Sequence, residues 1–154
     1  MFIRTRSGIS IKEFITEYLN AESDYISKRI STLFLNGTPV DDLDYEILTD
    51  GSVLALSAAM PGLAGAILRK GGHLAGLRTR VEKKHSAEKA ASGAWVKLKL
   101  FNALVPELGP GLLSRGIWVK ASSISSFPAE SNILPPYTDP DNPDEMVHVI
   151  VKAV

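Results

Sequence analysis

The side chains best suited to chemistry lie in a basic, glycine-rich stretch over residues 66–89. It holds seven lysines and arginines against two glutamates, together with two of the chain's three histidines. Cations beside the backbone amides of a glycine turn can form a site for phosphate or another anion. The residues that we expect to bind an anion or a partner are Arg69, Lys70, Gly71, Gly72, His73, Arg78 and Arg80.

The alternative interpretation of this stretch is a solvated linker that balances the acidic segments around it or docks onto them. Residues 36–50 and 128–145 each carry five carboxylates and no basic side chain. Aromatic side chains, on which a bound single strand would stack, are absent from the stretch. The sequence therefore carries no strong nucleic-acid signal.

No other pattern predicts a catalytic or metal site. The histidines His73, His85 and His148 are scattered, without a carboxylate at metal-ligand spacing, so no metal site and no cofactor are expected. The chain has no cysteine, which excludes thiol nucleophiles, disulfides and cysteine-ligated metals. Residues 109–114 resemble a dinucleotide fingerprint only in their first two glycines, and we expect a loop there. A serine–histidine–aspartate triad is recognised by geometry, so the sequence leaves it open.

Composition bounds the class of protein. The 154 residues are 45% hydrophobic, which fits one globular domain or two small ones. Seventeen basic residues balance seventeen acidic ones, so a uniformly basic binder is excluded. No apolar segment follows the basic start, which favours a cytoplasmic location. Residues 51–68 are uncharged, but Pro61 and the glycines favour a strand and a turn over a membrane span.

The elements of the first half are well marked. Ser10 and Glu13 have the spacing of a capping box, which predicts a helix of about ten residues. Apolar side chains then follow a helical period, namely Ile11, Phe14, Ile15, Tyr18 and Leu19. Residues 30–35 and 52–57 read as strands, with tight turns at Asn36-Gly37 and Asp50-Gly51.

The second half is less regular. Residues 95–101 alternate between polar and apolar side chains, which predicts a strand with one face toward water. Pro106 and Pro110 interrupt residues 104–113, for which we expect a short helical turn or loop. Residues 116–121 and 146–154 read as strands, and residues 122–145 as an irregular loop.

Two short motifs resemble those of a known family. Phe34-Leu35-Asn36-Gly37-Thr38-Pro39-Val40 and Asp50-Gly51-Ser52-Val53-Leu54-Ala55-Leu56 are similar to segments of the ubiquitin-like β-grasp sulfur carriers of thiamine and molybdopterin synthesis. The resemblance implies an α+β fold with a β-grasp-like half over residues 1–62. A basic glycine-rich connection over residues 63–93 and a smaller β-rich part over residues 94–154 would follow.

The resemblance does not carry the carrier activity with it. A sulfur carrier is activated at a free terminal glycine, and the equivalent tail would be Met60, Pro61 and Gly62, after which the chain continues to Val154. Gly71-Gly72 is internal as well. We therefore expect a non-catalytic binding or interaction module with a protein partner or self-association. The alternative is an enzyme or ligand-binding protein with an anion site between the halves.

One strand is missing from the β-grasp pattern. Such a sheet has its first strand in the middle beside the last, yet only residues 1–5 precede the predicted helix. A sheet without that strand would leave unpaired amides and carbonyls. We expect the second half, of this chain or a neighbouring one, to supply it through residues 95–101 or 146–154. The β-branched side chains favour the latter segment.

Overall fold

The computed structural model of the chain describes residues 1–74, 76, 93–124, 142 and 144–152. The described helices are α1 (Ile11–Leu19), α2 (Ser23–Arg29), α3 (Gly62–Leu68), α4 (Leu104–Arg115) and α5 (Ala121–Ile124). The described strands are β1 (Phe2–Thr5), β2 (Ile9–Ser10), β3 (Thr32–Leu35), β4 (Thr38–Pro39), β5 (Ile47–Leu48), β6 (Val53–Ser57), β7 (Ala94–Phe101), β8 (Ile117–Lys120) and β9 (Met146–Val149). The fold is therefore α+β, as the sequence predicts.

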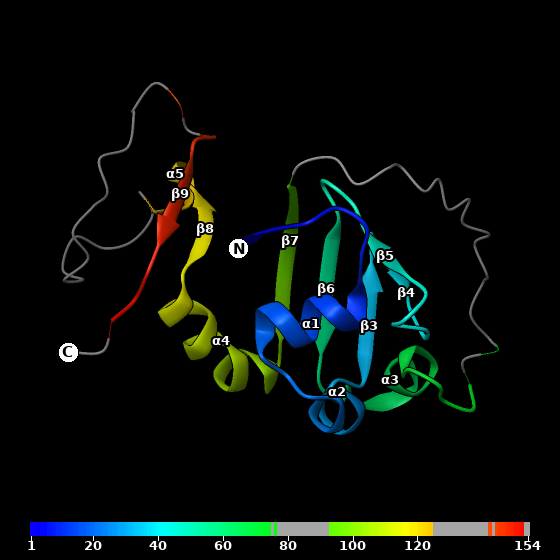
Figure 1. Cartoon of the computed structure of the whole chain (residues 1–154). Helices are drawn as coiled ribbons and strands as arrows, with labels where there is room; N and C mark the ends of the chain where they lie inside the picture. The colour runs from blue at the N-terminus through cyan, green and yellow to red at the C-terminus, as the bar shows by residue number, and fades with distance from the viewer. Residues whose placement is uncertain (75, 77–92, 125–141, 143, 153–154) are drawn as a thin grey trace.

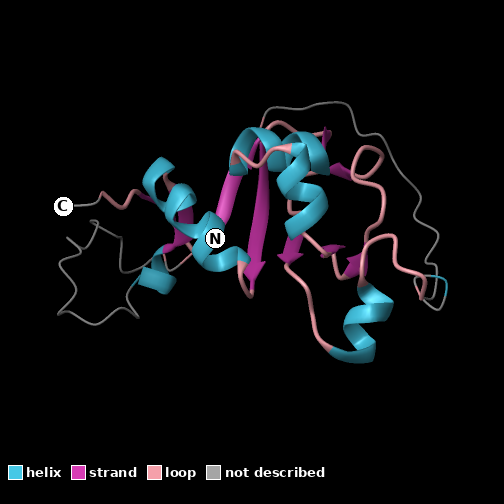
Figure 2. Ribbon diagram, turned by 90° about the horizontal axis from the view of Figure 1, so that it is seen from below, coloured by secondary structure: helices cyan, strands magenta, loops and turns pink. Residues whose placement is uncertain are grey.

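Seven of these strands form one mixed sheet in the order β4-β3-β6-β7-β1-β8-β9. Only the β6–β7 pair is parallel, and the other described neighbours are antiparallel. Strands β2 and β5 form a separate small ladder. Segments from both ends of the chain thus lie side by side (Figure 1), and the amino terminus lies within the body of the molecule in both views (Figures 1 and 2).

Strand β7 lies between β1 and β6. Lys97 is the register partner of Phe2 on one side and of Val53 on the other. The Leu98 amide donates to the Met1 carbonyl at 2.9 Å, and the Lys97 amide donates to the Ser52 carbonyl at 2.8 Å. The expectation that the second half supplies a strand beside residues 1–5 and 53–56 is confirmed, and so is the predicted strand over residues 95–101.

The prediction that residues 146–154, and not residues 95–101, fill the middle of the sheet is wrong. The β-branched segment favoured for the middle of the sheet forms only β9, a four-residue strand at its edge. Ile150 and Val151 follow β9 and are about half exposed, at 48% and 49%. The eight residues of β7 are long enough to pair with both β1 and β6, whereas β-branched content marks a strand without saying where it pairs.

Helix α1 forms as its sequence predicts. The Glu13 amide donates to the Ser10 hydroxyl at 3.2 Å, and the Ser10 amide donates to the Glu13 carboxylate at 3.1 Å. Asn20 ends the helix in the left-handed conformation, with a φ of 54°. Helix α1 lies across the strands of the sheet (Figure 1), and its buried side chains are Ile11, Phe14, Ile15 and Leu19.

Helix α4 corrects the prediction of a short turn or loop over residues 104–113. It runs for 12 residues with Pro110 inside it. Pro110 has no amide hydrogen to donate, and this loss should weaken the helix. Leu104, Leu108 and Leu112 nevertheless form one buried stripe at four-residue spacing, and α4 packs against β7 and α1. Burial of this stripe outweighs the lost hydrogen bond.

Helix α2 was not predicted. It has seven residues and a single buried side chain, Ile26, so its sequence lacks a helical period. Asp24 in its first turn and Lys28 and Arg29 in its last turn match the helix dipole. The predicted loop over residues 122–145 begins with α5 and otherwise falls largely outside the described residues.

We predict that Leu98→Ala lowers the free energy of unfolding by about 3 kcal/mol, because it opens a cavity in the middle of the sheet. Leu98 is 1% exposed in β7. The neighbouring exposed residue gives the matched control, and Lys97→Ala should change stability by less than about 0.5 kcal/mol. Urea unfolding of both variants measures the difference, and equal effects would contradict the inward placement of Leu98.

Candidate functional site

The two faces of the seven-stranded sheet differ in what covers them. One face packs with α1, α2 and α4 in the hydrophobic core. Because strand side chains alternate between faces, the intervening residues form the opposite surface, which we call the open face. Its residues include Phe2, Arg4, Phe34, Val53, Ala55, Trp95, Lys97, Lys99, Phe101, Trp118, Lys120 and His148, none of which belongs to the buried core.

A single row of register partners crosses the open face. It runs from Val53 to Lys97, Phe2, Trp118 and His148, one residue from each of five neighbouring strands. At the usual strand spacing, the row is about 19 Å long. It brings one cation and three ring side chains into line.

The rings of the open face contact one another and the adjacent cations. The Trp95 and Trp118 rings meet edge to face, with centroids 5.3 Å apart. The Trp118 and His148 rings are stacked at 4.7 Å. The Arg4 guanidinium lies 5.9 Å from the Trp95 centroid, and the Lys97 ammonium lies 5.6 Å from the Phe2 centroid. Cations at these distances are attracted to the ring faces.

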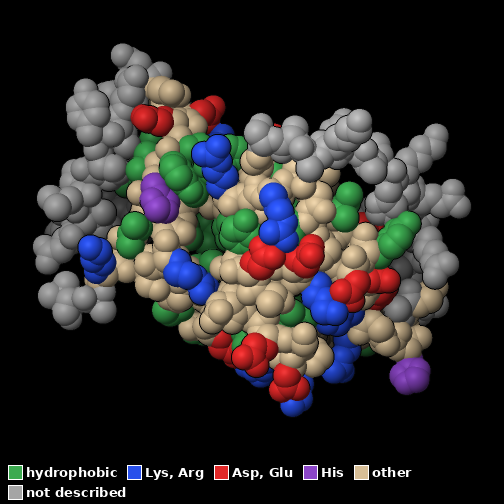
Figure 3. Space-filling model, in the orientation of Figure 1, with side chains coloured by type: hydrophobic (Ala, Val, Ile, Leu, Met, Phe, Trp, Pro, Cys, Tyr) green, Lys and Arg blue, Asp and Glu red, His purple; other side chains and the backbone are tan. Residues whose placement is uncertain are grey.

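Of the described cations of the open face, Lys120 pairs with Asp144 at 2.6 Å, and three others lack an anionic partner. Among the described residues, Arg4, Lys97 and Lys99 are exposed and make no ion pair. On the helix-covered face, basic and acidic side chains lie next to each other (Figure 3). The pairs of the helices and adjoining loops are Arg6–Glu17, Lys12–Asp44, Lys28–Asp24 and Arg29–Glu107. Positive charge is therefore left uncompensated on the open face, although the whole chain is neutral.

An apolar hollow of about 350 Å³ adjoins these cations on the open face. Phe34, Val53, Ala55 and Phe101 line it, with Lys99 at its border. Phe101 is 47% exposed, which is unusual for a phenylalanine in a central strand. The open face thus combines cations with exposed apolar surface.

Gly116 permits the ring packing at the end of the row. It caps α4 with a φ of +100°, and a Cβ added there would lie 2.3 Å from His148 Nε2. Any other residue at this position would push His148 away from its stack on Trp118. The turn after α4 therefore positions the open face.

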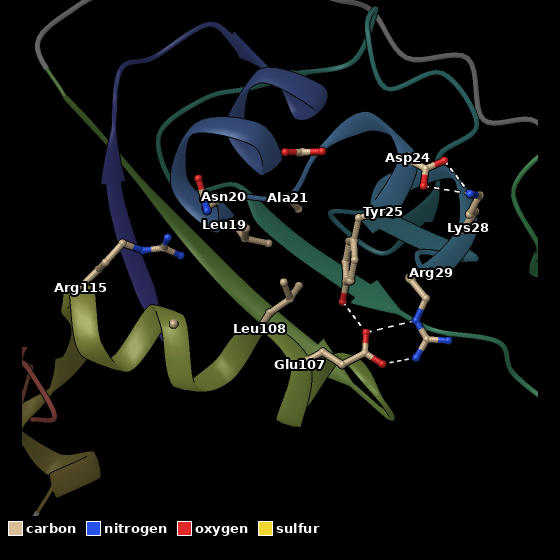
Figure 4. A pocket seen from close by; sticks show the side chains of 12 residues that line it. Leu19, Asn20, Ala21, Asp24, Tyr25, Lys28, Arg29, Glu107, Leu108 and Arg115 are labelled. Carbon is tan, nitrogen blue, oxygen red and sulfur yellow. Dashed lines mark hydrogen bonds and ion pairs between the residues drawn. The ribbon is translucent and has the colours of Figure 1, made fainter. Parts of the chain in front are cut away.

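A larger pocket lies on the helix side, between α2 and α4 (Figure 4), with a volume of about 660 Å³. Tyr25 donates to the Glu107 carboxylate at 2.6 Å, and Arg29 donates to both oxygens of the same carboxylate. Lys28 pairs with Asp24 at 2.9 Å. Because these charged groups pair with one another, we interpret the residues that line this pocket as a contact between α2 and α4.

The contacts of Glu107 shift the ionisation of the groups around it. Hydrogen bonds from Arg29 and Tyr25 lower the pKa of Glu107. Burial and the hydrogen bond to Glu107 raise the pKa of Tyr25 to about 12. The tyrosine therefore stays protonated over the whole neutral range.

Two members of the sequence-predicted anion site lie against carboxylates. The Gly71 amide donates to the Asp41 carboxylate at 2.9 Å, and the Lys70 ammonium donates to the Ile26 carbonyl at 3.4 Å. Asp41, Asp42 and Asp44 line the same pocket as Lys70 and Gly71. An anion bound there would face these three carboxylates, so the surroundings disfavour it. The contact matches the alternative in which the basic stretch docks onto the acidic segment.

The described contacts do not bring the other described members, Arg69, Gly72 and His73, together around one point. Arg69 and His73 are exposed, and the Gly72 amide donates to the Arg69 carbonyl at 3.1 Å. Arg78 and Arg80 lie outside the described residues. An anion site that includes all seven residues therefore stays a prediction.

The predicted carrier tail leads directly into a helix. Pro61 is the N-cap residue of α3, and Gly62 is its first residue, with a φ of +79°. Met60 lines the hollow of the open face. The chain then passes from α3 through Gly71-Gly72 toward β7.

The described part of the chain contains neither a metal-binding cluster nor a membrane-spanning helix. No group of three or more histidine, aspartate or glutamate side chains could hold a metal ion there. None of the helices described is long and apolar enough to cross a membrane.

Sequence reasoning missed the open face, although part of its signal was visible. The alternation Trp95, Lys97, Lys99 marked one face of a strand as polar, and the structure adds His148, which is exposed on β9. Phe2 and Trp118 lie far from β7 in the chain. Only the sheet order brings them together.

Comparison of the chain with protein-family models, with curated proteins and with solved structures finds no match.

We predict a tyrosine titration centred at about pH 12, which belongs to Tyr25. The pKa of Tyr25 is higher in the folded state than in the unfolded state. The stabilisation of the fold by the Tyr25 contact is therefore complete below pH 10.0 and is lost as the pH rises through about 12. Ultraviolet absorbance of tyrosinate measures the titration. Tyr25→Phe should remove it, and Glu107→Gln should lower its midpoint part of the way toward 10.0. An unchanged midpoint in Glu107→Gln would contradict the contact between the helices.

Proposed function

We propose that this chain is a non-catalytic binding module with a β-grasp-like arrangement, and that its open face binds an anionic partner. The observation that carries the proposal is the charge of that face. Arg4, Lys97 and Lys99 are exposed beside aromatic rings, and no carboxylate among the described residues pairs with them. Charge complementarity of this kind favours encounter with a partner of opposite sign.

The strand order supports the β-grasp-like arrangement. In the five strands β4-β3-β6-β7-β1, a central parallel pair is flanked by antiparallel neighbours, and α1 lies across them. A β-grasp sheet has its first strand beside its last. Here β7 takes the place of the first β-grasp strand, beside β6. Because β7 follows β6 in the chain and does not precede it, the order is that expected of a permuted β-grasp sheet. Strands β8 and β9 extend the sheet beyond β1.

The position of β7 also favours a binding module over a sulfur carrier. A carrier needs a free terminal glycine, which would require cleavage after Gly62 or Gly72. Either cut would sever the chain between β6 and β7, which are hydrogen-bonded neighbours in the middle of the sheet. A module that acts through its surface needs no such processing.

The proposal predicts that partner capture depends on the open face. The tagged full chain is purified from its native cell as the wild type, as Lys97→Glu with Lys99→Glu, and as Lys12→Glu with Lys28→Glu. The last variant changes charge by the same amount on the helix-covered face. We expect the partner to be retained by the wild type and the control, and to fall by at least about tenfold in the open-face variant, because like charges then meet at the interface.

Equal capture by all three proteins would contradict the proposal. The intact mass of the same preparations should be that of the full chain. A species ending at Gly62 or Gly72 would instead support a carrier.

A further inference from the structure

We infer that the anionic partner of the open face is a single-stranded nucleic acid, an inference that rests on the proposed function. Each nucleotide of a single strand offers a phosphate charge and a flat base whose faces are accessible. Proteins that bind single strands without sequence preference combine cations along the backbone with aromatic side chains on which the bases stack. The open face carries both kinds of side chain on one surface.

Strand β7 alternates these side chains along its length. Trp95, Lys97, Lys99 and Phe101 occupy successive positions of the open face, with a repeat of about 6.7 Å. Two cations are thus bracketed by two rings. Across the strands, Lys97 is followed by Phe2 and Trp118. Rings and cations therefore adjoin each other in both directions of the sheet.

In the structure, two cations cover aromatic rings of the open face. Arg4 lies over Trp95 and Lys97 lies over Phe2, and both cations are exposed on flexible side chains. When phosphates attract these cations, the ring faces that they cover become accessible to bases. The same four side chains can then serve the backbone and the bases of one ligand.

Other anionic partners match the open face less well. A duplex keeps its base faces stacked inside, so the rings of the open face could stack on them only if the duplex were kinked and unstacked, which costs free energy at each unstacked step. An acidic protein segment would neutralise Lys97 and Lys99 but would supply no flat group for Phe2 or Trp118. The ring row favours a ligand that alternates charge with flat rings.

The chain contains a built-in reporter of this surface. Its two tryptophans are Trp95 and Trp118, and both lie on the open face. Stacking of a base on either ring should quench the intrinsic fluorescence. A ligand that only neutralises the cations should leave most of the emission.

The test measures binding of the full chain to fluorescein-labelled oligothymidylate and oligouridylate of about ten nucleotides. Anisotropy gives the dissociation constant, and unlabelled oligonucleotides are used for quenching. A duplex of equal length, inorganic polyphosphate and polyglutamate are the comparison ligands. We expect quenching by the single strands alone. For three cations, the logarithm of the binding constant should fall with the logarithm of salt at a slope of about −2.

Variants separate the rings from the charges. Trp118→Ala should weaken oligonucleotide binding by about 5- to 150-fold, and Trp118→Phe should retain most of it because a ring remains. Lys97→Gln with Lys99→Gln should weaken binding and flatten the salt slope. Lys12→Gln with Lys28→Gln, on the helix-covered face, should change neither. The lysine variants alter exposed residues only, so the test stands even if Trp118→Ala fails to fold.

Several results would overturn the inference. Binding of polyphosphate as tightly as the oligonucleotides, without quenching by either, would show a general polyanion site. Binding of polyglutamate and not of the oligonucleotides would assign the face to an acidic protein and leave the proposed function standing. No binding by any ligand would reject the inference, and capture from the native cell would then decide on the proposed function separately.

Discussion

The backbone hydrogen-bonding groups of β1 and β6 set the central constraint on this chain. Both strands face the middle of the sheet, and a strand must lie between them because unpaired amides and carbonyls are costly when buried. Strand β7 meets that requirement from the second half of the sequence, with Lys97 opposite both Phe2 and Val53. The core follows from this placement, because Val96 and Leu98 point from β7 toward the helices, at 0% and 1% exposure. So does the open face, because the residues between them point the other way.

The two faces of the sheet differ in how their charged side chains are compensated. On the helix side, four ion pairs form among the described residues, and the Arg29–Glu107 pair together with Tyr25 joins α2 to α4. Such exposed pairs contribute little to stability individually, but each of them neutralises the charge of its two members. On the open face, Arg4 and Lys97 lie over aromatic rings and make no ion pair with a carboxylate of the described residues. A protein with no net charge can therefore carry a local positive surface, which the net charge alone does not reveal.

Local rules could be read from the sequence, and pairing between distant segments could not. The Ser10–Glu13 box predicted α1 because both partners of its hydrogen bonds lie within one turn. The alternation around Lys97 predicted a strand with one polar face, but β-branched content then favoured the wrong segment for the middle of the sheet. Helix α4 was missed because Pro110 weakens a helix locally, whereas its leucine stripe is stabilised by packing on β7. The site was missed for a related reason: Phe2, Trp95 and Trp118 become neighbours only through the strand order.

The most direct test of this account is whether β7 lies between β1 and β6 in solution, because both the core and the open face depend on that placement. Inter-strand nuclear Overhauser effects from the backbone protons of Lys97 provide the measurement. The account predicts contacts from this one residue to Phe2 on one side and to Val53 on the other, as the register requires. Contacts to only one of the two strands, or to β9 in the place of either, would contradict it.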